Sequence, residues 1–156
     1  MSISTTLESC LESKSGQYEI FHHSHTANSM ATAEAAHIPG DRLAKTVILE
    51  DDIGYAAAVL PSTRHLSLTD LWKQTGRRLQ LASEDDVREL FKDCELGALP
   101  PVAMAYGMPT YLDESLVHEP DVYFEAGDHE ALIHMRSEQF LDLMQDSRRI
   151  SCAHRM

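Results

Sequence analysis

Two apolar segments joined by a short polar turn most constrain the fold of this 156-residue chain. Residues 42–50 and 55–60 are short, apolar and rich in β-branched or small side chains, which is typical of buried strands. The residues between them, Asp51-Asp52-Ile53-Gly54, have the length and the glycine of a hairpin turn. The sequence therefore predicts an antiparallel strand pair here.

Lys45 stands in the first of these segments, where a lysine is unexpected. Side chains alternate between the two faces of a strand, so Lys45 shares a face with Leu43, Val47 and Leu49. An ammonium group among aliphatic side chains loses hydration, which lowers its pKa unless an anion meets it. Two interpretations stay open: Lys45 reaches water at the edge of the sheet, or it serves a functional site.

The rest of the chain mixes helical and extended segments without a repeat or a linker. Helices are predicted at residues 5–13, 29–37, 67–74 and 83–92 and from Ser137, and further strands at residues 18–23, 78–82, 108–112, 122–125 and 131–135. Because the order is not a strict βαβ alternation, we expect an α+β fold, in a single domain over residues 1–156 with a mostly antiparallel sheet. The C-terminal tail, residues 147–156, is expected to be frayed.

The composition is that of an ordinary globular domain, with 43% hydrophobic and 24% charged residues. No apolar run approaches the roughly 18 residues of a transmembrane helix, and the polar, acidic N-terminus is not a signal peptide. Three widely spaced cysteines, Cys10, Cys94 and Cys152, predict a reduced, cytoplasmic protein.

The net charge is -12, and the two signs are unevenly distributed. Eight of the 13 basic residues lie between Arg42 and Lys92, whereas Arg136 is the only one between Asp93 and Asp146. A strongly acidic chain repels polyphosphate at long range. Any nucleic-acid partner is therefore expected to be contacted locally, on the face that the middle third of the chain builds.

Two loops could carry chemistry. The segment from Gly97 to Pro101 contains one glycine and two prolines, so it can hold backbone N–H and C=O groups toward a ligand in fixed positions. The alternative is a simple tight connector. Gly127-Asp128-His129 lies in the predicted hairpin between residues 122–125 and 131–135, where His129 is either an acid, base or gate or an exposed turn residue.

Several catalytic arrangements are absent from the sequence. It has no G-x-S-x-G elbow, no P-loop, no G-x-G-x-x-G and no H-E-x-x-H. His22, His23 and His25 suggest a metal site, but no Cys, Asp or Glu accompanies them at a ligand spacing. We therefore expect neither a metal nor another cofactor.

Seven segments form an ordered set: residues 32–36, 42–49, 58–61, 76–77, 81–84, 91–101 and 122–127. In this order they resemble the YbaK-like aminoacyl-tRNA deacylases, relatives of the editing domain of bacterial prolyl-tRNA synthetases. The resemblance extends from about Tyr18 to Met144, nearly the whole chain. It implies a mixed, barrel-like sheet flanked by helices, with the editing domain at about residues 18–146.

The resemblance also implies a site. In that family a strand lysine is essential for deacylation, and Lys45 falls on it. The family's G-x-x-x-P loop maps onto Gly97 to Pro101, and residues near the hairpin tune the size of the accepted amino acid. Lys45 is thus implied as the catalytic residue, and the implied substrate-binding residues are Thr46, Gly97, Ala98, Leu99, Pro100, Pro101, Gly127 and His129.

The expected reaction is attack of water on the ester of a mischarged aminoacyl-tRNA, with tRNA(Pro) carrying alanine or cysteine as the expected substrate. A rigid loop could position the water and the aminoacyl group. Lys45 would orient the acceptor end, or act as general base if burial lowers its pKa far enough. The expected partners are the acceptor end of the aminoacyl-tRNA and prolyl-tRNA synthetase or another translation factor. No interaction with a membrane is expected.

Two other functions stay open at this stage. One is a tRNA- or synthetase-binding module without turnover, although such a module needs neither Lys45 nor the spacing of Gly97 and Pro101. The other is a hydrolase of a small ester or thioester, which the charge of -12 favours.

Overall fold

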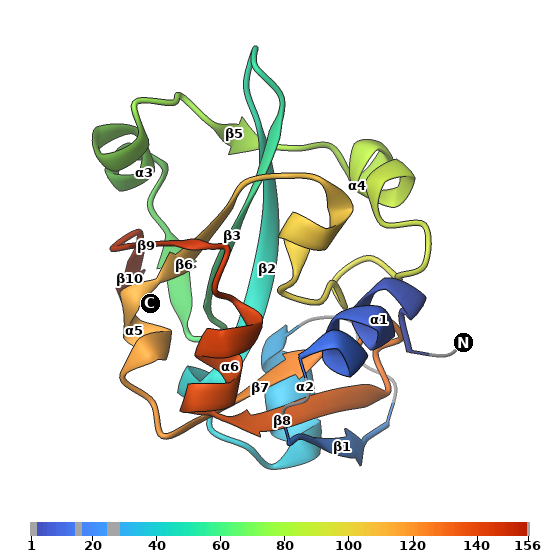
Figure 1. The fold of residues 1–156 in the computed structure, drawn as a ribbon. Coiled ribbons are helices and arrows are strands. Elements are labelled where there is room, and N and C mark those ends of the chain that lie inside the picture. The colour runs from blue at the N-terminus through green and yellow to red at the C-terminus, as the bar shows by residue number, and fades with distance from the viewer. Residues whose placement is uncertain (1–2, 15–16, 25–28, 156) are drawn as a thin grey trace.

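The computed structural model describes residues 3–14, 17–24 and 29–155, without the side chains of residues 29 and 30. In this part of the chain, ten strands form an eight-stranded mixed sheet and a separate two-stranded sheet, flanked by helices (Figure 1). The strand order is β1-β8-β7-β2-β3-β6-β9, with β5 beside β2. Five of the eight strand pairings are antiparallel, as predicted. The pairing path ends at β1 and β9, so hydrogen bonds between described strands do not close the barrel-like sheet.

The strands of the sheets are β1 (Glu19–His22), β2 (Leu43–Glu50), β3 (Tyr55–Pro61), β4 (Arg64–Leu66), β5 (Gln80–Leu81), β6 (Thr110–Asp113), β7 (Asp121–Glu125), β8 (Ala131–Arg136), β9 (Arg148–Ile150) and β10 (Ala153–Arg155). The helices are α1 (Thr5–Ser13), α2 (Ser29–Ala36), α3 (Leu68–Thr75), α4 (Glu84–Leu90), α5 (Glu114–Val117) and α6 (Ser137–Leu143). Two 3-10 turns lie at Gly40–Arg42 (η1) and Ala103–Tyr106 (η2).

The predicted hairpin of residues 42–60 is confirmed. β2 and β3 pair in antiparallel register, from Ala44 opposite Pro61 to Glu50 opposite Tyr55. At the turn, the Asp51 carboxylate accepts hydrogen bonds from the backbone N–H groups of Ile53 and Gly54, at 2.9 and 3.1 Å. A side chain that bonds its own turn is the reason Asp favours such positions.

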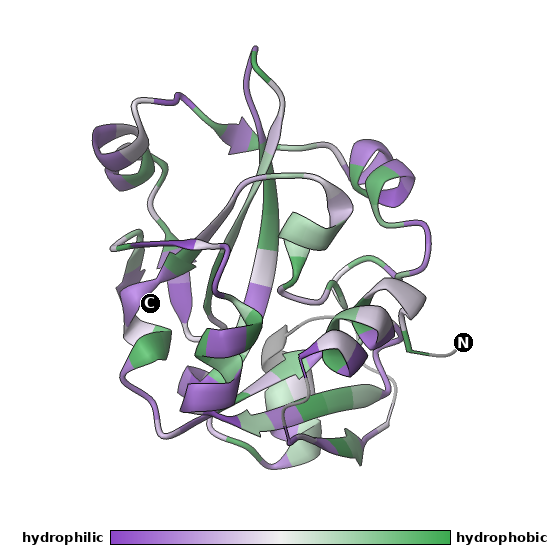
Figure 2. Cartoon of the chain, in the orientation of Figure 1, coloured by the Kyte–Doolittle hydropathy of each residue, from purple (hydrophilic) through white to green (hydrophobic). Residues whose placement is uncertain are grey.

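Helices cover both faces of the strands β7 and β8. The largest core cluster packs residues of α1 and α6, including Leu7 and Phe140, against Phe124 and Ile133. On the opposite face, Ala33 of α2 packs with Leu43 and Leu132. Figure 2 shows the hydrophobic residues along β2 and β8 and mostly hydrophilic residues on the outer helix α3. No helix in the described ranges is long and apolar enough to cross a membrane.

The expectation of a frayed C-terminal tail is wrong. β9 pairs with β6 in parallel, and β10 pairs with β4 in antiparallel register. Ile150 and Cys152 are buried, and the backbone N–H of Cys152 donates to the Asp113 carboxylate at 2.8 Å. The short tail contains only a few apolar residues among charged ones. It is ordered because distant strands offer it hydrogen-bonding edges, which the local composition does not reveal.

Smaller differences also lie at segment ends. The predicted strand at 78–82 shortens to Gln80–Leu81, and Arg136 rather than Ser137 is the N-cap of α6. The short elements β4 and α5 were not predicted, since three or four residues carry too little periodicity to identify them.

Ile150→Ala should lower the free energy of unfolding by about 2–5 kcal/mol, because it opens a cavity at a buried position. The neighbouring exposed residue provides the control, and Arg149→Ala should change stability by less than about 0.5 kcal/mol. Urea unfolding followed by circular dichroism measures both. Equal, negligible effects would mean that the tail is not part of the folded domain.

Candidate functional site

Lys45 lies in β2 between two apolar clusters. Leu43 belongs to the cluster under α2, whereas Leu49 and the partly buried Val47 belong to a second cluster farther along the strand. The Lys45 side chain is half-buried, and burial lowers its pKa from the ordinary value for lysine. No described residue forms an ion pair with it. Lys45 is therefore a partly desolvated cation without an ion-pair partner among the described residues.

In the parallel pairing of β2 with β7, Lys45 and Glu125 are the residues one register position beyond the last residue pair. Leu43 lies opposite Tyr123, and Ala44 lies opposite Phe124. Lys45 and Glu125 are the residues that follow in each strand. Because Leu43 and Tyr123 both pack in the cluster under α2, the side chains two residues farther along leave the sheet on this same face.

Glu125 is 2% exposed, although it is a carboxylate. Burial raises its pKa to about 7; the nearby Thr32 hydroxyl acts in the opposite direction, and the charge of Asp128 adds to the rise. Neither carboxylate oxygen accepts a hydrogen bond of normal geometry from a described residue. The sequence analysis did not single out this residue. The signal was available, since a glutamate between Phe124 and Ala126 in an apolar strand is as unexpected as Lys45.

The loop before Gly97 and the turn at Gly127 lie against each other, although about 30 residues separate them in the chain. The backbone N–H of Glu95 donates to the carbonyl oxygen of Gly127 at 2.7 Å. The His129 ring nitrogen Nε2 forms a hydrogen bond with the carbonyl oxygen of Leu96. The structure therefore brings the two residues just before the predicted loop into contact with the turn at Gly127.

A single carboxylate fixes the start of this loop. Asp93 accepts hydrogen bonds from the Ser4 hydroxyl at 2.7 Å, the Thr6 backbone N–H at 3.1 Å and the Tyr106 hydroxyl at 2.8 Å. Burial would raise its pKa, but these hydrogen bonds outweigh burial and hold the pKa well below the ordinary value. Asp93 thus ties α1 and η2 to the loop.

The side chains of the predicted loop face the core. Gly97 is exposed and has a positive φ of 81°, whereas the next four residues, Ala98 to Pro101, are all buried. Leu99 packs in a cluster with Ile48, whose side chain leaves β2 on the face opposite to Lys45. The Leu99 side chain therefore packs on the face of β2 opposite to Lys45.

Thr46 occupies a gap in the pairing of β2. One edge of β2 pairs with β3. The other edge pairs with β7 at Leu43 and Ala44 and with β5 at Leu49 and Glu50, which leaves a gap between them. Ser62 donates to the Leu43 carbonyl oxygen, so the peptide groups of odd-numbered residues face β3 and those of even-numbered residues face the other edge. The Thr46 N–H and C=O therefore point into the gap, and its buried hydroxyl accepts no hydrogen bond from the described residues.

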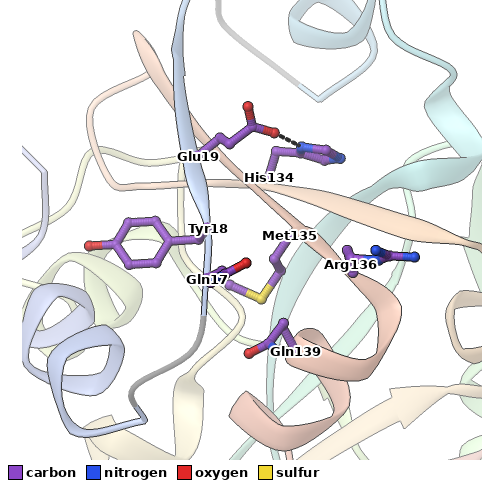
Figure 3. Close-up of a pocket in the computed structure, with 7 residues that line it drawn as sticks. All are labelled: Gln17, Tyr18, Glu19, His134, Met135, Arg136 and Gln139. Carbon is purple, nitrogen blue, oxygen red and sulfur yellow. Dashed lines mark hydrogen bonds and ion pairs between the residues drawn. The ribbon is translucent and has the colours of Figure 1, made fainter.

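A separate surface pocket of about 540 Å³ lies where β1 and β8 meet α6 (Figure 3). Its lining residues are Gln17, Tyr18, Glu19, His134, Met135, Arg136 and Gln139. Glu19 and His134 form a hydrogen bond of 2.8 Å across its rim. The pocket contains none of the predicted site residues, so it is not the site that the sequence analysis proposed.

Residues 23–143, more than half of the chain, match the aminoacyl-tRNA editing domain family. The chain belongs to this family. The resemblance noted in the sequence is thereby confirmed, and the editing domain provides the frame for the residues described above. No curated protein matches the chain.

Solved structures share the fold of this editing domain. The hypothetical protein APE2540 has 20% identity and a TM-score of 0.84, covering 96% of this chain and 99% of that chain. A candidate trans-editing enzyme for prolyl-tRNA synthetase has 22% identity and a TM-score of 0.82, covering 98% and 99%. A candidate signal transduction protein of Marinobacter aquaeolei VT8 has 22% identity and a TM-score of 0.77, covering 97% of this chain but 31% of its own. At these identities the likeness shows the fold.

Cys94 adjoins the loop of the editing domain but is unsuited to act as a nucleophile. Burial raises the pKa of its thiol to about 12, so the reactive thiolate is not populated near neutral pH. Of the three histidines considered for a metal, His25 lies outside the described residues. Within the described ranges no group of three or more His, Cys, Asp or Glu residues could hold a metal ion.

Gly127 is required where the turn meets the loop. Its φ is 109°, and a Cβ added there would lie 3.2 Å from the Cβ of Ser4 and 3.4 Å from the carbonyl oxygen of Asp93. Gly127→Ala should therefore destabilise the domain by about 1–3 kcal/mol from backbone strain, with a further loss from the crowding.

Gly107→Ala is the matched control, because Gly107 also has a positive φ, 86°, but no atom within 4 Å of an added Cβ. Urea unfolding of both variants separates strain from crowding. If both lose the same stability, the close approach of loop and turn contributes nothing measurable.

Proposed function

We propose that this editing domain hydrolyses the ester bond of mischarged aminoacyl-tRNA, with Lys45 as the residue that meets the acceptor end. The observation that carries the proposal is the partly desolvated ammonium group of Lys45, which has no ion-pair partner among the described residues. A cation held in this way is suited to bind a phosphate or to stabilise a developing negative charge, because both interactions are stronger where water is excluded.

The surrounding groups supply fixed backbone dipoles and no side-chain nucleophile. Thr46 presents its peptide group at the gap in β2, and the loop at Gly97 is held by the carboxylate of Asp93 and by the turn at Gly127. Preorganised N–H and C=O groups can position an ester and an attacking water without reorganising during the reaction. A cation and fixed backbone groups without a side-chain nucleophile fit direct hydrolysis of the ester by water.

We further propose tRNA(Pro) carrying a small amino acid, alanine or cysteine, as the substrate, and the reducing cytoplasm as the location. The sequence resemblance supports this choice, and one protein of the same fold is a candidate trans-editing enzyme for prolyl-tRNA synthetase. The acceptor end would be the part of the tRNA that is bound, with prolyl-tRNA synthetase or another translation factor as a further partner. All three cysteines are free, in keeping with a reducing compartment.

A small-ester hydrolase that does not use tRNA is the second candidate function. The net charge of -12 favours it, because such a charge repels polyphosphate at long range. Turnover of tRNAs charged with Ala, Cys, Ser, Thr and Pro, compared with small aminoacyl esters, separates the two functions.

Lys45→Ala should abolish most deacylation while the domain stays folded, because the change removes a charge and leaves no buried polar group without a partner. Lys45→Met retains the apolar stem and should be equally inactive, which separates the charge from packing. Single-turnover deacylation of mischarged tRNA is the measurement, with the exposed residue change Lys92→Ala as control. Wild-type rates in folded Lys45→Ala would exclude the proposed role.

His129 is proposed to shape the wall of the aminoacyl pocket. It is 4% exposed, has a positive φ of 60°, and its ring bonds the Leu96 carbonyl oxygen, so it holds the turn at a fixed distance from the loop. Rigid walls discriminate by size, whereas one methylene in an apolar pocket contributes only about 1–3 kcal/mol.

His129→Ala should therefore admit bulkier aminoacyl groups with a smaller effect on the native substrate. His129→Asn is the companion variant, since asparagine tolerates the left-handed backbone. Deacylation rates across tRNAs charged with amino acids of increasing size test this expectation. If all rates fall together in the same rank order, His129 does not select by size.

A further inference from the structure

Four strands contribute to one row of side chains on the face under α2. Phe21 of β1 lies opposite Leu132 of β8, and Leu132 lies opposite Glu125 of β7. Directly paired residues point to the same face of a sheet, and Lys45 of β2 follows at the next register position after Ala44. The row therefore holds Glu125 and, one register position beyond the last paired residues of β2 and β7, Lys45, with apolar side chains at its other positions.

The carboxylate in this row is not explained by stability. An ionised carboxylate that is 2% exposed needs a cation or several hydrogen bonds to offset its lost hydration. Glu125 has no ion pair with a described residue, and neither oxygen accepts a hydrogen bond of normal geometry from one. Such groups in native proteins commonly have a chemical role.

We propose that Glu125 takes the proton of the attacking water, an inference that rests on the deacylase function proposed above. The two charged residues of the row then have different tasks. Lys45 remains an ammonium that faces the negative charge of the acceptor end or of the oxyanion. Glu125, with a pKa of about 7, can change its protonation state near neutral pH, as a general base requires.

The reaction balances with these groups alone. The water oxygen forms a bond to the ester carbonyl carbon, and the water proton passes to the carboxylate of Glu125. The tetrahedral intermediate then collapses, and its bond to the ribose oxygen breaks. Protonated Glu125 returns the proton to that ribose oxygen, which releases the free amino acid and the tRNA with its terminal hydroxyl group.

The charged and titratable groups around Glu125 come from each neighbouring element. Lys45 lies on β2, one register position beyond the last pair with β7, and Asp128 and His129 lie in the turn that follows β7. His23 lies just after β1, and its backbone N–H donates to the Glu130 carbonyl oxygen at the end of the same turn. From α2, the uncharged Thr32 hydroxyl is the group that acts on Glu125. The negative charge of Asp128 favours the protonated form of Glu125, as burial does.

The experiment is single-turnover deacylation of mischarged tRNA between pH 5.5 and 8.5, after subtraction of the rate without enzyme. The wild type should show a rate that rises with pH through a step near pH 7, where Glu125 loses its proton. Glu125→Gln has nearly the same shape and cannot accept the proton, so its rate should fall by about 100-fold or more and the step should disappear. Glu125→Asp, which keeps the carboxylate, should retain part of the rate and the step.

Glu130→Gln is the matched control, since Glu130 is exposed and lies five residues farther along, and it should leave both rate and step unchanged. Thermal unfolding of each variant verifies that it is folded. The same assay with N-acetylated aminoacyl-tRNA should show an equal loss in Glu125→Gln, because the proton acceptor acts on water and not on the amino group.

Two results would overturn the proposal. The first is a pH step that persists in folded Glu125→Gln. The second is a loss confined to substrates with a free amino group, which would make Glu125 a receptor for the ammonium group of the amino acid. A wild type without any deacylation would instead refute the proposed function itself, so the two failures are distinguishable.

Discussion

A two-residue parallel pairing between β2 and β7 joins the two halves of the sheet. β1, β8 and β7 form one half, and β2, β3, β6 and β9 form the other. Leu43 opposite Tyr123 and Ala44 opposite Phe124 are the only residue pairs of this junction. The chain separates beyond it, with β7 turning at Gly127 and β2 continuing beside β3. The groups proposed for chemistry all lie at or beside this divergence, where strand pairing no longer consumes the backbone.

The turn that follows β7 is fixed by contacts from outside the sheet. Asp93 fixes the start of the loop through three donors, and the loop in turn bonds the Gly127 carbonyl oxygen and the His129 ring. Four of these five contacts involve a side chain, and the Glu95 N–H to Gly127 carbonyl bond joins the two backbones directly. These contacts hold His129 in its strained, positive-φ conformation. Such strain is common where the backbone must keep a fixed geometry.

Local patterns predicted the parts of this arrangement that depend on neighbours in sequence. The hairpin at Asp51, the alternation around Lys45 and the turn at Gly127 all follow from a few consecutive residues. A glutamate in an apolar strand was as visible as Lys45, but the sequence could not show that Glu125 lies in the strand that pairs with the one holding Lys45, 80 residues away. The open edge at Thr46 was equally hidden, since it exists only because β7 and β5 pair with β2 on either side of it.

The C-terminal strands were missed for the same reason, because their partner strands lie far away in the sequence. Their position also affects when the two sheets can be completed during synthesis. β9 and β10 complete edges formed by β6 and β4, so residues near the end of the domain finish two sheets that begin much earlier. A nascent chain leaves the ribosome from its N-terminus. The central hairpin can form while the rest is being translated, but β6 and β4 must wait for residues 148–155 to emerge. Until those residues emerge, the edges of β6 and β4 that they pair with stay exposed.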